Sequence, residues 1–351
     1  MNLRWLTDFA TKVDSISGRK AVVDPRNAGK ERIARDGAME IKVYEEAVSY
    51  FLLSLFPFLT MPQSYKAWQH LQQTISKYYA AGHHASDPTT ATVTHNRANT
   101  LTEYGFTGDE IRLLECTLPV VSTRNAILTL YWLLLYILPL PSLLEKLPAE
   151  IAASAKTSPS DSVGTRSITL NISEFEIELP LLVSCYREIL RPVDHTICNR
   201  RIMQDMTITY QDGQSYLLKK GVDIQLPAGF THRHTTSWGP DAEQFRTDLF
   251  LASTSKVIGA DRTRKVAYMP FGGGRHLCPG RTFAFAEIIG CAAVMLLGFD
   301  VEATGMGFED TQMRGPRFSS STVKPVGSDK GLGAMIKHRE EFASVAWKFY
   351  S

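Results

Sequence analysis

The sequence predicts a mostly α-helical fold with a small β region late in the chain. Helical patterning dominates residues 40–80, 107–138, 180–191 and 281–297, whereas 201–229 alternate apolar and polar residues between glycine turns. The chain has 351 residues, of which 44% are hydrophobic, so it is long and apolar enough to bury a large core in one domain or two.

The longest apolar segment, residues 126–144, allows two interpretations. Its length suffices to cross a bilayer, which takes about 20 residues. Pro139 and Pro141 end it, however, and Arg124 and Asn125 precede it, so we favour a buried core helix over a membrane span. The shorter apolar run 50–59 also predicts core.

Two polar segments separate the predicted helices. Residues 86–100 and 156–167 are rich in Ser and Thr and predict exposed loops. The tail, 298–351, mixes Gly and Pro with short runs that resemble strands.

Charge and cysteine usage disfavour several classes of protein. The formal net charge of +2 is too close to zero to indicate a nucleic-acid binder. Five cysteines are odd in number and lack paired spacing, which disfavours a disulfide scaffold and a structural zinc site. The histidine pairs His83–His84 and His232…His234 have no matching carboxylates in helical register, so we expect surface histidines.

The segment FGGGRHLCPG, residues 271–280, concentrates the chemistry of the chain. Three glycines allow the loop to curl so that its amides face the thiol of Cys278 at the start of a helix, which stabilises a thiolate. Pro279 suits the first helical turn, and Gly280 lets a flat ligand approach the backbone. Haem meets these demands, with Arg275 and His276 placed to reach its carboxylates. The alternative, an inert buried cysteine beside a glycine turn, is disfavoured by the whole string.

This string resembles the haem-thiolate signature of the cytochrome P450 family, with His276 where the family usually has arginine. Glu188-Ile-Leu-Arg191 resembles the family's upstream Glu-x-x-Arg pair, which braces the haem loop. The resemblance implies haem b as cofactor and Cys278 as its iron ligand. The residues implied to contact haem are Phe271, Gly274, His276, Cys278, Gly280 and Arg200, the last near a propionate.

The resemblance also gives the long apolar helix a role. In the family such a helix crosses the distal face of the haem with an acid and a threonine that handle oxygen. Arg124 and Asn125 stand at those positions here. Asparagine in place of threonine is similar to the branch with sterol 7α-hydroxylases and prostacyclin synthase, and to many fungal members. The candidate catalytic residues are therefore Asn125, Glu188 and Arg191.

Two departures from the family pattern stand out. Leu249 occupies the arginine position of the P-x-R-F segment, so the Glu188–Arg191 pair is expected to lack its usual third partner unless Arg246 replaces it. The resemblance covers only about the C-terminal two-thirds of a typical member. We therefore expect an N-terminally truncated P450-like domain over 1–351, without the membrane anchor, the proline-rich hinge and the first sheet strands.

The activity that the resemblance implies is monooxygenation of a lipophilic small molecule, such as a terpenoid, sterol or polyketide of secondary metabolism. Electrons come from NADPH through NADPH–cytochrome P450 reductase. The basic run 261–265 is then either a solvated loop or a reductase contact. A full-length form is expected on the cytosolic face of the endoplasmic reticulum membrane, and this chain, without the anchor, in the cytosol. No nucleic-acid partner is expected.

Three alternatives remain at this point. Arg124 and Asn125 suit a haem-thiolate isomerase or dehydratase that needs no O2. Leu249 and the short N-terminus suit an inactive truncated remnant. A membrane channel or carrier would need further apolar spans besides 126–144.

Overall fold

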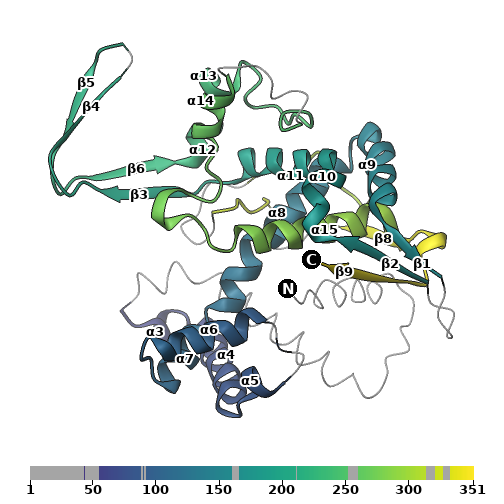
Figure 1. The fold of residues 1–351 in the computed structure, drawn as a ribbon, viewed down its shortest axis with the longest axis horizontal. Coiled ribbons are helices and arrows are strands. Elements are labelled where there is room, and N and C mark those ends of the chain that lie inside the picture. The colour runs from purple at the N-terminus through teal and green to yellow at the C-terminus, as the bar shows by residue number, and fades with distance from the viewer. Residues whose placement is uncertain are drawn as a thin grey trace.

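Two long apolar helices form the centre of the fold. The computed structural model describes residues 43, 55–87, 90, 92–159, 166–210, 212–251, 260–313, 321–326 and 333–351. Helix α8 (Leu118–Ile137) and helix α15 (Arg281–Gly298) pack on each other and on α9 (Pro141–Ser154) and α11 (Pro180–Val193) (Figure 1).

The remaining elements surround this centre. The other helices are α3 (Pro57–Thr60), α4 (Pro62–Ala80), α5 (His83–Ser86), α6 (Thr92–Glu103), α7 (Gly108–Glu115), α10 (Phe175–Glu178), α12 (Ala228–Thr231), α13 (Thr235–Trp238) and α14 (Ala260–Ala267), with 3-10 turns at Ile172–Glu174, Gly274–His276 and Glu340–Phe342. The strands are β1 (Lys156–Ser158), β2 (Arg166–Asn171), β3 (Ile197–Arg201), β4 (Met206–Thr209), β5 (Ser215–Leu218), β6 (Asp223–Pro227), β7 (Phe299–Ala303), β8 (Ala334–His338) and β9 (Val345–Tyr350).

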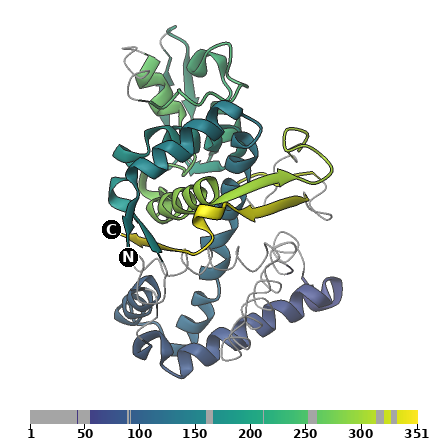
Figure 2. The same cartoon turned by 90° about the vertical axis from the view of Figure 1, so that its right-hand side faces the viewer.

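Helices α3–α7 gather at one end of the molecule, and α8 runs from them into the body (Figure 1 and Figure 2). A capping box starts α7, in which Thr107 and Glu110 bond each other's backbone amides. The buried Glu115 carboxylate then ties α7 to its neighbours, because it accepts from Tyr79 on α4 at 3.1 Å and from Arg97 on α6 at 2.9 Å.

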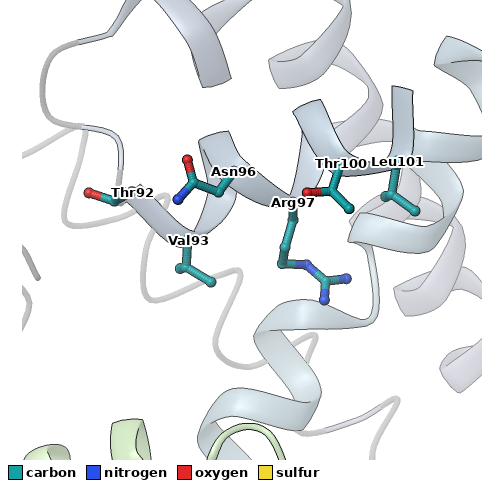
Figure 3. A pocket seen from close by; sticks show the side chains of 6 residues that line it. All are labelled: Thr92, Val93, Asn96, Arg97, Thr100 and Leu101. Atoms are coloured by element: carbon teal, nitrogen blue, oxygen red, sulfur yellow. The ribbon is translucent and has the colours of Figure 1, made fainter. Parts of the chain in front are cut away.

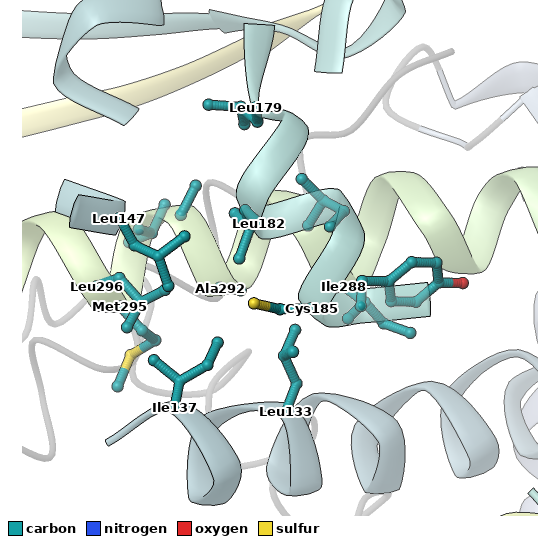
Figure 4. Packing of buried hydrophobic residues seen from close by; sticks show 14 of the residues in the cluster. Leu133, Ile137, Leu147, Leu179, Leu182, Cys185, Ile288, Ala292, Met295 and Leu296 are labelled. Atoms are coloured by element: carbon teal, nitrogen blue, oxygen red, sulfur yellow. The ribbon is translucent and has the colours of Figure 1, made fainter. Parts of the chain in front are cut away.

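The core lies where α8, α9, α11 and α15 meet. Leu133 and Ile137 of α8 face Leu182 and Cys185 of α11 across Ala292 of α15, and all of these side chains are buried (Figure 4). The carboxylate of Glu150 on α9 accepts from the amides of Leu181 and Leu182 at 2.8 and 3.0 Å, which satisfies the free amino end of α11.

The β elements are small and peripheral. Strands β1, β2 and β9 form one sheet in that order, with β2 and β9 parallel. Strands β3 and β6 pair antiparallel, as do β7 and β8. The hairpin β4–β5 extends from the body beyond β3 and β6 (Figure 1).

The predicted core helix in 126–144 is confirmed, and it ends near its prolines. The axes of Arg124–Ile137 and Pro141–Ser154 differ by 119°, and Pro141 opens α9. By length and composition, α15 alone could cross a membrane, as could this bent pair if it were one span, within the described residues. Within α15, 72% of the residues are buried, as is also typical of a core helix in a folded domain.

Most predicted elements are confirmed, and four expectations are wrong. Helix α6 occupies most of 86–100, because tertiary contacts such as the Arg97–Glu115 pair override weak local preference. Strand β1 lies within 156–167, and the basic run 261–265 is part of α14 rather than a loop. Leu55, Phe56, Phe58 and Leu59 are exposed rather than core. Residues 44–54 lie outside the described residues.

Removing a side chain from the centre of α8 is expected to destabilise the whole domain. Leu133→Ala should lower the free energy of unfolding by about 2–5 kcal/mol, because it leaves a cavity between α8 and α11. Ile127→Ala, on the exposed face of the same helix, should change it by less than about 0.5 kcal/mol. Urea unfolding followed by circular dichroism measures both, and equal effects would contradict the packing described.

Candidate functional site

A tight loop presents Cys278 just before α15. The amide of Cys278 donates to the carbonyl of Phe271 at 3.0 Å, which closes the loop. Gly272 and Gly274 take φ values of 73° and 65°, a region that strains other residues. Helix α15 begins at Arg281 with Gly280 as its N-cap, so Pro279 precedes the helix. The prediction that Pro279 lies in the first helical turn is therefore wrong.

Cys278 is the accessible cysteine of the described residues, since Cys116, Cys185, Cys198 and Cys291 are buried. A side chain at position 280 would meet the sulfur at 3.8 Å, so glycine keeps one side of the thiol uncovered. The hydroxyl of Tyr186, on α11, is buried with no hydrogen-bond partner among the described residues. Burial raises the pKa of Tyr186, and a charge on Cys278 would raise it further. The site therefore holds an unsatisfied polar group close to the loop.

The predicted Glu188–Arg191 pair on α11 is buried, and all of its hydrogen-bond donors are used. Arg191 donates to both carboxylate oxygens of Glu188, at 3.0 and 2.8 Å. Its remaining donors reach the carbonyls of His232 at 2.9 Å, Gln244 at 2.8 Å, and Ala242. The acceptors of the Arg191 guanidinium are therefore the Glu188 carboxylate and three backbone carbonyls.

The third partner of this pair is a backbone amide. The N–H of Arg246 donates to Glu188 at 2.9 Å, while its guanidinium instead pairs with Asp248 at 3.4 Å. Leu249 is buried beside Trp238 and Ala242. Arg246 therefore replaces the partner that is missing at Leu249, as the sequence allowed, but it does so through its backbone amide and not through its guanidinium.

The remaining predicted haem contacts lie on or against the loop. Arg200, on β3, donates to the carbonyl of Gly273 at 2.6 Å and so braces the loop from outside. His276 is exposed within the 3-10 turn. Gly272 lies against Cys198 of β3, where an added side chain would meet the sulfur at 3.4 Å.

Asn125 belongs to a second polar cluster. Its side-chain oxygen accepts from the amide of Thr322 at 3.3 Å, and Thr129 lies 3.4 Å from the Thr322 hydroxyl. The backbone of Asp194, at the end of α11, pairs with Thr322 in an isolated antiparallel β-bridge. Burial raises the pKa of the Asp194 carboxyl to about 7. The cluster therefore joins α8, the end of α11 and the segment 321–326. Arg124 beside it is buried.

His232 is the residue that the sequence reasoning misplaced. His83 and His234 are exposed and His84 is half-buried, but His232 is completely buried, so the expectation of a surface histidine is wrong for it. Its ring bonds the carbonyl of Arg191 on α11 and the amide of Met269, two residues before the cysteine loop. Ala228 and His232 are four residues apart and are followed by Trp238. This spacing is typical of a buried helical face and could have predicted that His232 is buried.

Two cavities lie away from Cys278. One of about 550 Å³ runs along α6 and is lined by Thr92, Val93, Asn96, Arg97, Thr100 and Leu101 (Figure 3). Another of about 470 Å³ lies between α4 and α7. The guanidinium of Arg97 is already engaged by Glu115, so the first cavity is a packing feature of the α3–α7 end of the molecule.

The donor set at the loop fits haem better than a bare metal ion. No group of three or more His, Cys, Asp or Glu side chains is arranged to hold a metal within the residues that the structure describes. A structural zinc site takes four protein ligands, whereas a haem brings its own four nitrogens and needs a single axial residue. A lone accessible thiol in a glycine loop meets that need.

Comparisons with known proteins identify the family to which the chain belongs. The family model described as Cytochrome P450 matches residues 38–325. This chain belongs to the cytochrome P450 family. It resembles a cytochrome P450 monooxygenase of Gibberella zeae, with 32% identity over 99% of this chain and 64% of the relative. It also resembles the monooxygenase nodJ of Hypoxylon pulicicidum, with 27% identity over 86% of this chain and 57% of the relative.

Two further similarities are more distant. Cytochrome P450 7A1 of Rattus norvegicus is 28% identical over 57% of this P450 chain and 39% of its own length. A crystal structure of a cytochrome P450, CYP102L1, matches with a TM-score of 0.61 and 19% identity, over 81% of this chain and 60% of its own, which supports the P450 fold. The chain thus spans less than two thirds of the length of these relatives.

The Glu188–Arg191 pair should tolerate no change of shape. Arg191→Lys keeps the positive charge but loses the planar guanidinium. The carbonyls of His232 and Gln244 therefore lose their hydrogen-bond donor. We expect the free energy of unfolding to fall by about 2–5 kcal/mol. Arg187→Lys, in the exposed pair with Glu176, should cost less than about 1 kcal/mol. Urea unfolding of the two variants decides, and an equal cost would contradict the role of the pair.

Glu287, nine residues after Cys278 on α15, gives the fold a pH dependence. Burial raises its pKa to about 8 from a usual value of 4.5. Between these pH values the folded chain binds one more proton than the unfolded chain, so its stability is fully present below about pH 4.5 and is lost as pH rises through about 8.

Glu287→Gln should remove that dependence, because glutamine takes up no proton. The wild type should lose about 1.4 kcal/mol of unfolding free energy per pH unit relative to the variant across this window. Unfolding at pH 5, 7 and 9 measures the difference. Parallel pH profiles of the two proteins would show that Glu287 ionises without cost to the fold.

Proposed function

We propose that the chain is a haem-thiolate monooxygenase that inserts one oxygen atom from O2 into a lipophilic small molecule. The observation that carries the proposal is the loop 271–280 with its one accessible thiol, found together with the fully satisfied, buried ion pair of Glu188 and Arg191. Membership of the P450 family supports it. The domain that performs this activity is proposed to span residues 1–351.

The predicted site residues, in the loop and around it, each have a role in the proposal. Haem b, when bound, would supply an iron centre able to activate dioxygen, and Cys278 would hold that iron through its thiolate. Phe271 closes the loop through its carbonyl, and Gly274 and Gly280 allow close approach of a planar group. His276 and Arg200 place positive or hydrogen-bonding groups at its edge. Glu188 and Arg191 hold the irregular segment 232–246 against α11.

Electron supply is proposed to come from NADPH through NADPH–cytochrome P450 reductase. Helix α14 places the exposed Arg262 and Lys265 shortly before the cysteine loop, and Arg275 and Arg281 are exposed in and after it. Such a basic surface favours an acidic protein partner. A full-length form is proposed to act at the cytosolic face of the endoplasmic reticulum membrane.

The substrate is proposed to be a secondary metabolite such as a terpenoid, sterol or polyketide. Its support is the similarity to monooxygenases of two fungi, Gibberella zeae and Hypoxylon pulicicidum. The apolar helix α8, which in the proposal lies over the haem, favours a lipophilic molecule.

An isomerase or dehydratase is the second candidate. The observation that favours it is Asn125, whose side-chain oxygen is occupied by the amide of Thr322 in place of a free hydroxyl, with Arg124 where the acid is expected. Rearrangement of an oxygenated lipid needs no proton delivery to O2. Turnover of such a lipid without NADPH would select this candidate.

The spectrum of the ferrous carbon monoxide complex tests the ligand. The purified 351-residue chain, loaded with haem, should show the thiolate-type Soret band, and Cys278→Ala should lose it. Cys116→Ala, a buried cysteine at the end of α7, should retain it. A wild type without this band would show that the chain does not assemble a haem-thiolate site. Incorporation of oxygen-18 from O2 with reductase and NADPH then separates the two candidate activities.

A further inference from the structure

His232 joins the end of α11 to the residues that open the cysteine loop. We propose that it is a positioning residue: by holding Met269 against α11, it sets the place of the Cys278 thiol. The inference rests on the proposed function only where Cys278 ligates iron, and the anchoring of the loop can be tested without haem.

The imidazole bonds on both of its nitrogens. Nδ1 lies 3.1 Å from the carbonyl oxygen of Arg191, and Nε2 accepts from the amide of Met269 at 3.0 Å. One neutral tautomer, with the proton on Nδ1, satisfies both contacts.

On the helix side, His232 completes the last turn of α11. The carbonyl of Arg191 would normally accept from the amide four residues later, but the amide of His195 donates to Ser321 at 2.7 Å. The imidazole takes that place. The carbonyl of His232 in turn accepts from the Arg191 guanidinium at 2.9 Å, so the residue contacts Arg191 twice.

On the loop side, the bond reaches the base of the turn that carries the thiol. The carbonyl of Met269 accepts from Gly272 at 3.0 Å, and the carbonyl of Phe271 accepts from Cys278 at 3.0 Å. Met269 is therefore two hydrogen bonds away from the backbone of Cys278. Tyr268 adds a second anchor, because its hydroxyl donates to the carbonyl of Arg187 on α11 at 2.8 Å.

The surroundings keep His232 neutral and still. Its ring lies between Trp238 and Tyr268, with ring centroids at 6.4 and 5.7 Å. The pKa of His232 is lowered to about 4, mainly by burial, with smaller contributions from the charges of Arg191, His195 and Arg233, while the hydrogen bond to the Arg191 carbonyl opposes the shift. At neutral pH Nε2 is thus free of a proton and able to accept from Met269.

Three variants separate hydrogen bonding from packing. His232→Phe keeps a ring between Trp238 and Tyr268 but removes both bonds. His232→Gln restores a donor and an acceptor and should rescue. His234→Phe, an exposed histidine two residues away, is the matched control. Should His232→Phe fail to fold by circular dichroism, His232→Asn, too short to reach Met269 from Arg191, takes its place.

The first readout uses the haem-free chain. Cys278 is the accessible cysteine of the described residues, so its alkylation by iodoacetamide, located by mass spectrometry, reports how well the loop is held. We expect a rate at least about fivefold higher in His232→Phe, the change that follows the loss of a buried hydrogen bond. His232→Gln and His234→Phe should label at nearly the wild-type rate.

The second readout uses the haem-loaded chain. The share of protein with the thiolate-type carbon monoxide band should fall by about fivefold in His232→Phe and recover in His232→Gln. Equal labelling rates and equal band shares in His232→Phe and wild type would overturn the proposal. Loss without rescue by glutamine would also overturn it, since packing alone would then explain the effect. A wild type without the band overturns the proposed function, and the labelling rates still decide the anchoring of the loop.

Discussion

The buried ion pair of Glu188 and Arg191 is the interaction on which the rest of this fold depends. Two opposite charges at nearly zero exposure are costly to desolvate, and they persist only when every donor and acceptor is used. Here the backbone of a long irregular segment completes the pair: the carbonyls of His232, Ala242 and Gln244 accept, and the amide of Arg246 donates. The pair therefore organises a stretch of chain with little regular structure and presses it against α11.

That arrangement places the chemistry at a junction between rigid and irregular parts of the chain. Helices α8, α11 and α15 supply the rigid part through an apolar core. The cysteine loop lies at the edge of this core. Arg200 donates to the loop itself, and just before the loop Tyr268 donates to the carbonyl of Arg187 and Met269 donates to the ring of His232. A loop held by several weak bonds to a stiff support keeps its shape while leaving one side of the thiol accessible.

The sequence predicts much of this and fails where long-range contacts decide. Local patterns suffice for α11, for α15 and for the strands around the turns at Gly213 and Gly221, because hydrophobic period and glycine placement are local properties. The ten-residue string at Cys278 predicts the site directly. Helix α6 and the burial of His232 are missed, since both follow from partners far away in the chain, Glu115 and Met269. The sequence names Arg246 as the replacement for the arginine missing at Leu249, but a side-chain pattern does not show that the backbone amide makes the contact.

The hairpin β4–β5 has a consequence for handling the protein. Met206, Ile208 and Tyr216 are 42–51% exposed, and with Leu218 they occupy paired positions along one face of the hairpin. Two strands that project from the body and carry apolar side chains in solvent favour self-association. Preparations of this chain therefore call for mild detergent or a polar substitution such as Ile208→Thr to keep it monodisperse.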